Sequence, residues 1–135
     1  MVAGYSGTPL VKKLGIKAGQ QLAFINEPDH FRSLLVDLPV KRDIRTTARG
    51  KADLAIAFFV RRSEFERRLP ALQTSIFPAG ALWVAWPKRA SRVPTDMTED
   101  VVREVALPLG LVDIKVCAID ETWSGLKVVW RKENR

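Results

Sequence analysis

The segment from Asp53 to Val60, apolar in all but its first residue, constrains the fold of this chain more than any other segment. A strand exposed on one face alternates apolar and polar residues, whereas a strand buried on both faces is apolar almost throughout. Strands of the second kind belong to parallel sheets that are covered by helices. A second such run, Ala81 to Trp86, is closed by Pro87. The two runs predict an α/β protein with a largely parallel sheet at its centre.

The N-terminal part of the chain predicts a short helix and a first strand. Thr8 and Pro9 are typical of a helix start, with Thr8 as N-cap and Pro9 at the first helical position. Residues 21–26 predict a strand, and a short helix is expected to follow from Phe31. Residues 44–47 are the candidate for a short edge strand.

Between the two apolar runs lies a helix signal that a proline interrupts. Ser63 and Glu66 have the spacing of a capping box, in which each side chain bonds the other residue's amide. Pro70 falls inside the segment and removes one helical hydrogen bond. We therefore expect either a kinked helix or two short helices, the second extending through Ile76.

The C-terminal part predicts one more helix and a hairpin. Residues 96–99 are typical of a helix cap, and Gly110 ends the helix that follows. Residues 112–120 and 125–131 predict two strands joined by a short turn. Such a turn cannot make a parallel crossover, so the pair is expected to be antiparallel. The sequence leaves open whether the last strand is a sheet edge or lies inside the sheet.

These elements predict an open, mostly parallel Rossmann-like sheet of about five strands, with helices on both faces and a C-terminal antiparallel hairpin. With 135 residues, one α/β domain is expected over 1–135, residues 1–18 being an N-terminal arm and short helix. No apolar run approaches the roughly 18 residues of a membrane span. The N-terminus also lacks a signal-peptide pattern. We expect no membrane partner and a cytoplasmic location.

The composition excludes several kinds of site. Cys117 is the only cysteine and His30 the only histidine, so neither an internal disulfide nor a structural zinc site can form. Cys117 lies in an apolar run and is expected to be a buried, inert thiol. The net charge of +7 would attract nucleic acid if the basic residues met on one face. They are spread along the whole chain, so nucleic-acid binding is kept as an alternative.

Five segments together resemble an uncharacterised bacterial family, domain of unknown function 3052. They are Gly4 to Leu10, Lys13 to Lys17, Gly80 to Lys88, Thr95 to Gly110, and Val116 to Leu126. The likeness covers nearly the whole chain. It implies no activity, because the family has none assigned.

The order of strands and helices from Asp53 onward also looks like the C-terminal half of class I methyltransferases. In that fold the last strand is inserted antiparallel beside its predecessor. Methyltransferases place a glycine-rich loop after their first strand, where backbone approaches the methyl donor closely. Here Asn26 to His30 follow the first strand, without a glycine. A degenerate methyltransferase-like enzyme is therefore a further alternative, and no cofactor is predicted.

In an open α/β sheet, ligands bind outside the carboxyl ends of the strands. Four predicted loops meet there, and their charged and aromatic side chains suit a small anionic or zwitterionic molecule. The predicted ligand-binding residues are Asn26, Glu27, Arg61, Lys88, Arg89, Ser91, Asp120, Glu121, Trp123 and Ser124. Polar residues end the strands of every such fold because loops face water, so plain solvated loops remain the alternative.

Within this set, Lys88 and Arg89 are the strongest candidates for contact with an anion, since arginine offers a planar fork of donors. Asp120 and Glu121 are expected in a hairpin turn, and His30 is expected to be a surface residue without a partner. No nucleophile–base pair, metal cluster or cofactor loop is visible, so no catalytic residue is predicted. The main hypothesis is a non-catalytic domain that binds a small anion or regulates another protein, and the oligomeric state stays undetermined.

Overall fold

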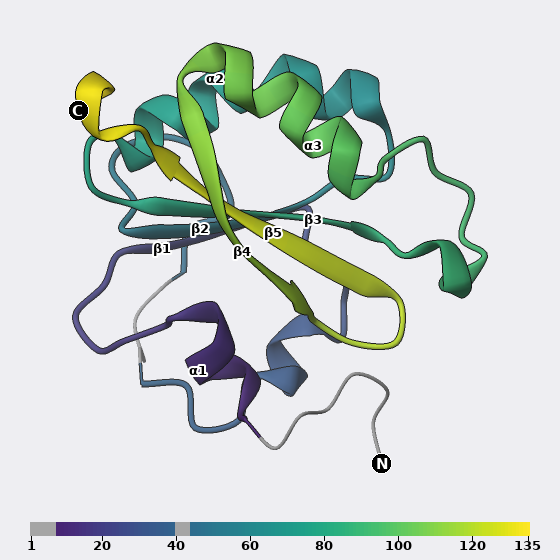
Figure 1. Ribbon diagram of the computed structural model, residues 1–135. Coiled ribbons are helices and arrows are strands. Elements are labelled where there is room, and N and C mark those ends of the chain that lie inside the picture. Colours follow the sequence, from purple (N-terminus) through teal and green to yellow (C-terminus); the bar gives the residue numbers. More distant parts are fainter. Residues whose placement is uncertain (1–7, 40–43) are drawn as a thin grey trace.

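A five-stranded sheet forms the centre of the computed structural model, which describes residues 8–39 and 44–135 (Figure 1). The strand order is β1-β2-β3-β5-β4. The strands are β1 (Leu22–Ile25), β2 (Leu54–Phe58), β3 (Ala81–Pro87), β4 (Leu111–Ala118) and β5 (Trp123–Trp130). Strands β1, β2 and β3 are parallel, and β5 is antiparallel to both of its neighbours. The predicted sheet and hairpin are confirmed, and the last strand lies inside the sheet.

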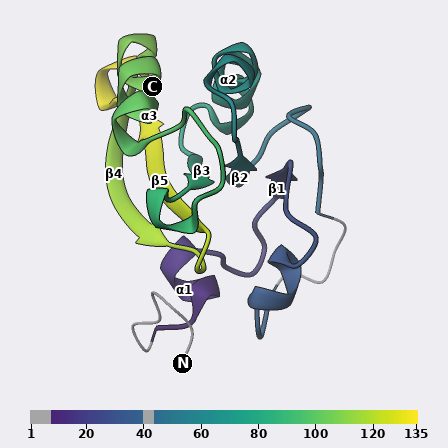
Figure 2. The ribbon, with the colours of Figure 1, turned by 90° about the vertical axis from the view of Figure 1, so that its right-hand side faces the viewer.

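Helices cover both faces of the sheet, as predicted (Figure 2). On one face lie α2 (Arg62–Ile76) and α3 (Glu99–Ala106). On the other lie α1 (Leu10–Leu14) and the 3-10 helix η1 (Phe31–Leu34). Further 3-10 turns are η2 (Arg89–Ser91), η3 (Leu107–Leu109) and η4 (Lys132–Asn134). No helix in the described ranges is long and apolar enough to span a membrane.

The unbroken apolar runs supply two hydrophobic cores at once. Successive strand residues point to opposite faces, so Ile56 packs on the α1 side while Ala57 packs on the α2 side. In β3, Trp83 belongs to the core on the α1 side and Trp86 to the core on the α2 side, as their spacing predicts. Both faces of β2 and β3 are therefore shielded from water. For this reason apolar and polar residues do not alternate along these strands.

The starts of α1 and α2 differ from the predicted caps. Pro9, not Thr8, occupies the N-cap position of α1, and no side chain caps that helix. Helix α2 begins one residue before the predicted cap Ser63, because a carboxylate oxygen of Asp96 accepts a hydrogen bond of 2.7 Å from the Arg62 amide. The partner that caps α2 is 34 residues away in the sequence. A local motif cannot reveal such a cap.

Helix α2 runs through Pro70 as one helix of 15 residues, so of the two alternatives that the sequence left open, the split into two short helices is wrong. Pro70 is exposed, and its ring therefore displaces nothing in the core. Helix α3 follows its sequence signal, since the Thr98 hydroxyl accepts a hydrogen bond of 3.1 Å from the Val101 amide.

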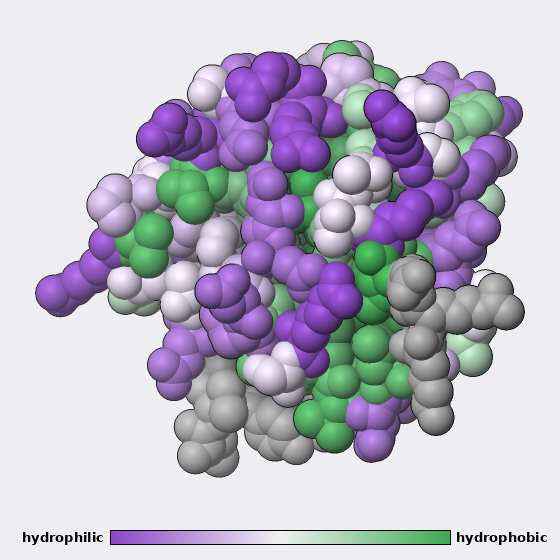
Figure 3. All heavy atoms as spheres, turned by 180° about the vertical axis from the view of Figure 1, so that it is seen from behind, coloured by the Kyte–Doolittle hydropathy of each residue, from purple (hydrophilic) through white to green (hydrophobic). Residues whose placement is uncertain are grey.

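The predicted edge strand at residues 44–47 is reduced to a single parallel bridge between Arg45 and Ala23. The Phe24 amide donates to the Arg45 carbonyl at 2.8 Å, and the Arg45 amide donates to the Leu22 carbonyl at 3.1 Å. Figure 3 shows the molecule from behind, on the side of β1. Hydrophilic residues cover much of this face, and hydrophobic residues gather near the bottom of the view.

Candidate functional site

The carboxyl ends of the parallel strands and the start of β5 lie at one end of the molecule, which we call the strand-end rim (Figure 1). It comprises residues 26–32, 59–62, 88–98 and 119–124. Because β5 runs against its neighbours, its first residue Trp123 pairs with Pro87, the last residue of β3. The Lys88 amide donates to the Thr122 carbonyl at 2.8 Å. Lys88 and Trp123 therefore share this rim.

The loop after β1 is held by its own side chains. Asn26 has a φ of 57°, a left-handed conformation that asparagine tolerates better than most residues. Its side-chain nitrogen donates to the Phe58 carbonyl at 3.1 Å, and Arg68 donates to its side-chain oxygen at 3.4 Å. Glu27 accepts two parallel hydrogen bonds from Arg32, at 2.7 and 3.0 Å. These contacts tie the end of β1 to β2, α2 and η1.

Asp120 joins the β4–β5 turn to the loop after β1. Its Oδ1 accepts hydrogen bonds from the amides of Thr122 and Trp123, at 2.8 and 2.7 Å. Its Oδ2 lies 2.7 Å from Nε2 of His30, so the prediction that His30 has no partner is wrong. Burial raises the pKa of Asp120, but the bonds to His30 and to the two amides outweigh it and hold the pKa below its usual value.

An aromatic row lies directly beneath this part of the rim. Trp123 meets Phe58 edge-on with ring centres 5.1 Å apart, and Phe58 meets Phe31 at 4.9 Å. Phe31 in turn meets Phe24 at 5.1 Å. The four rings connect the hairpin, β2, η1 and β1, so the underside of the loop after β1 is filled by the protein itself.

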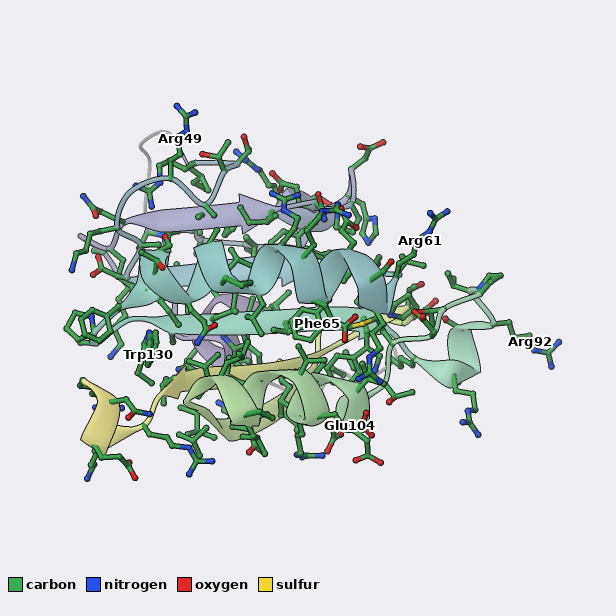
Figure 4. All side chains as sticks on the ribbon, turned by 90° about the horizontal axis from the view of Figure 1, so that it is seen from above. Arg49, Arg61, Phe65, Arg92, Glu104 and Trp130 are labelled. Carbon is green, nitrogen blue, oxygen red and sulfur yellow. The ribbon has the colours of Figure 1, made fainter. Side chains whose placement is uncertain are left out.

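The loop after β3 carries three basic residues of the rim: Lys88, Arg89 and Arg92. The Ser91 hydroxyl donates to the Lys88 carbonyl at 2.6 Å and accepts from the Val93 amide at 3.2 Å, so it stabilises the turn η2. Lys88 is partly exposed and Arg89 is exposed. Seen from above, Arg61 and Arg92 extend outward at this same end of the molecule (Figure 4).

All ten predicted ligand-binding residues lie in the rim loops or at the strand ends that carry them, in two groups. Five have side chains engaged by other parts of the protein: Asn26, Glu27, Ser91, Asp120 and Trp123. The other five have no side-chain hydrogen bond to any residue in the described ranges: Arg61, Lys88, Arg89, Glu121 and Ser124.

Two features escaped sequence reasoning. The first is the pairing of His30 with Asp120, which are 90 residues apart. The second is a group of lysines on the α1 side of the sheet, around Lys127. The sequence signal for it is Lys127, which stands between the apolar residues Leu126 and Val128. Cys117 is buried as predicted, and burial raises the pKa of its thiol, although the nearby charges of Lys13 and Lys115 act in the opposite direction.

Solved structures that resemble this chain are methyltransferases. A ribosomal protein L11 methylase from Lactobacillus delbrueckii subsp. bulgaricus has a TM-score of 0.62 at 11% identity, covering 90% of this chain and 75% of its own. The magnesium protoporphyrin IX methyltransferase of Synechocystis PCC 6803, with bound SAM, has a TM-score of 0.56 at 12% identity, covering 90% and 74%. A SAM-dependent methyltransferase from Aquifex aeolicus has 0.55 at 10% identity, covering 88% and 86%.

The chain has a methyltransferase-like fold. The expected architectural likeness is thereby confirmed, and with identities this low it concerns the fold alone. No protein-family model and no curated protein matches the sequence, so the likeness to domain of unknown function 3052 is not confirmed. In the described part of the chain, no group of three or more His, Cys, Asp or Glu residues is arranged to hold a metal ion.

Proposed function

We propose that this chain is a non-catalytic domain with a methyltransferase-like fold, which binds a small anionic ligand at the strand-end rim. The proposal depends on one observation: side chains of the protein itself hold the loop after β1 in place. In methyltransferases a glycine-rich loop at this place lets backbone approach the methyl donor. Here Asn26 begins the loop, and its side chain bonds the carbonyl of Phe58 at 3.1 Å.

The contacts beneath this loop support the loss of a donor site. Phe31 follows the loop directly and packs edge-on against Phe24 and Phe58. His30 is tied to Asp120 from the hairpin at 2.7 Å. For a donor to lie against the backbone here, the aromatic row and the His30–Asp120 contact would have to separate. Protein interiors are close-packed, so such a separation costs the packing of several rings at once.

The acidic side chains of the rim are largely engaged, and this supports an anionic ligand. Glu27 pairs with Arg32, and Asp120 pairs with His30. Asp96 accepts from the amide that begins α2. Arg32 and Arg62 of the same rim are also paired. Four basic side chains of the rim form no ion pair with any described residue: Arg61, Lys88, Arg89 and Arg92. Two exposed carboxylates, Asp29 and Glu121, offset part of this charge. The remaining positive field would attract a small anion.

We assign the His30–Asp120 pair a positioning role rather than a catalytic one. A general base acts on a nucleophile or substrate within hydrogen-bond reach. Among the described residues, the only side-chain partner of the His30 ring is Asp120. Asp120 is itself committed to two amides of the turn. Its role is to hold the hairpin against the loop after β1.

The test is a thermal-shift panel of nucleotides, phosphosugars and carboxylates at constant ionic strength. At ten times the dissociation constant, a ligand that binds only the folded state should raise the melting temperature by about 4 °C. The double variant Lys88→Ala, Arg89→Ala should show a clearly smaller shift. The matched control, Arg67→Ala with Lys132→Ala, removes two exposed basic residues elsewhere and should keep it. A panel without any shift, or equal shifts in both variants, would refute the rim as the anion site.

A further inference from the structure

Four lysines meet on the α1 side of the sheet, away from the strand-end rim. This lysine cluster consists of Lys13 in α1, Lys17 just after it, Lys115 in β4 and Lys127 in β5. Lys115 and Lys127 are direct partners across the two strands. The Lys115 ammonium donates to the carbonyl of Lys13, and the Lys13 ammonium donates to the carbonyl of Ala118, both at 3.3 Å. These contacts fix α1 against the β4–β5 edge of the sheet.

Lys127 lies at the centre of the cluster. Its Nζ is 5.9 Å from the ring centre of Trp83, which is fully buried. A Cβ atom on Gly15, at the end of α1, would lie 3.5 Å from the same Nζ. Within the described ranges this ammonium has no hydrogen-bond or ion-pair partner. Burial lowers the pKa of Lys127, and the charges of Lys115 and Lys17 lower it further.

Among the described residues, no carboxylate forms an ion pair with the lysine cluster. Residues 1–26 contain three lysines but no aspartate or glutamate, and residues 114–119 contain none either. None of the four lysines forms an ion pair with a described residue. Like charges directly opposite each other on neighbouring strands destabilise a sheet. A partly buried charge without a hydrogen-bond or ion-pair partner also costs free energy, which the Trp83 ring offsets only in part. An anion bound at this place would compensate both unfavourable features.

We propose that the lysine cluster binds a phosphate group. A phosphate carries close to two negative charges at neutral pH and presents several oxygens to surrounding donors. Lysine ammonium groups bind it as point charges, each with three donors. Lys115 is the cross-strand partner of Lys127 and contacts Lys13, and the Lys127 ammonium lies near the end of α1, so the lysines gather at one place. Such a group suits one phosphate rather than an extended polyanion. Inorganic phosphate and the phosphate of a small metabolite share this chemistry.

The first experiment measures melting of the full chain in potassium phosphate and in potassium chloride of equal ionic strength. Phosphate should raise the melting temperature to a plateau, by about 4 °C at ten times the dissociation constant. The same measurement is made in the double variant Lys88→Ala, Arg89→Ala, so that phosphate binding at the rim does not contribute. The rise should persist in this double variant and should be abolished when Lys127→Gln is added to it. A rise that persists in the triple variant, or no rise in the double variant, overturns the proposal.

The second experiment needs no substitution, so it tests the proposal even if Lys127→Gln disturbs the fold. The ionisation of Lys127 can be followed in the unchanged protein by NMR of its Cε group, with and without phosphate. A bound anion favours the charged form, so the apparent pKa of Lys127 should rise by about one unit with phosphate. An unmoved pKa overturns the proposal.

Glucose 6-phosphate and a short single-stranded oligonucleotide are tested in the same way as inorganic phosphate. Equal shifts with the sugar phosphate support the proposal, whereas binding of the oligonucleotide alone, weakening steeply with salt, overturns it in favour of a nucleic-acid surface.

Discussion

Replacing Trp83 by alanine is expected to lower the free energy of unfolding by about 4 kcal/mol. The indole is fully buried at the centre of β3, and its Nε1 donates to the carbonyl of Leu14 at 2.9 Å. The neighbouring strand is fitted to the ring, because a Cβ atom on Gly125 would lie only 3.1 Å from it. Alanine would leave a cavity and also an unpaired buried carbonyl at the end of α1. Urea denaturation followed by circular dichroism measures the change.

The control for this prediction is Trp83→Phe. Phenylalanine keeps most of the apolar area but loses the N–H that holds Leu14, so a smaller loss of about 2 kcal/mol is expected. The difference between the two variants separates the cavity from the hydrogen bond. A loss below about 1 kcal/mol for alanine would contradict the packing of α1 on β3.

Replacing Asp120 by alanine is expected to lower the free energy of unfolding by about 3 kcal/mol. The substitution leaves the amides of Thr122 and Trp123 without their acceptor and releases His30 from the hairpin. Asp120→Asn is the matched control, because its oxygen still accepts from the amides while the charge is lost. About half of the effect should remain. Equal stabilities of Asp120→Ala and the unchanged chain would show that the hairpin is held by Trp123 and its neighbours alone.

The Asp120 carboxylate also predicts a pH dependence. Because the folded-state pKa of Asp120 lies below the ordinary value of 3.8, its contribution is fully present above that value. The contribution is lost as the pH falls through the lower, folded-state pKa. The stability difference between the unchanged chain and Asp120→Asn should therefore shrink as the pH falls below 3.8. Urea titrations at several pH values measure it, and a difference that stays constant down to about pH 2 would contradict this assignment.

Local patterns predict the fold of this chain well, because two central strands and the hairpin turn each have a recognisable local sequence pattern. The run that includes Ile56 and the run that includes Trp83 are apolar on both faces, which is typical of strands in a parallel sheet covered by helices. The turn between β4 and β5 is too short for anything but a hairpin. The position of β5 inside the sheet depends on pairing between distant strands, which no local pattern records.

The candidate site was less predictable, because its contacts join residues far apart in the sequence. The absence of glycine between Asn26 and His30 is visible in the sequence, but the side chains that fill the loop are not. Asp120 lies 90 residues from His30, and Asp96 caps a helix 34 residues before it. The register that sets Lys115 opposite Lys127 depends on an irregularity between Asp113 and Lys115. Such pairings become visible only when the strands are assembled into the sheet, so local sequence patterns do not predict them.

Calorimetric titration of S-adenosylmethionine into the full chain tests most directly whether this methyltransferase-like fold has lost its donor site. With Asn26 bonded across to β2 and the aromatic row beneath the loop, injections up to about 1 mM ligand should give only the heat of dilution. A saturable curve with one site and a dissociation constant in the micromolar range would contradict the account, because the donor would then occupy space that these side chains fill.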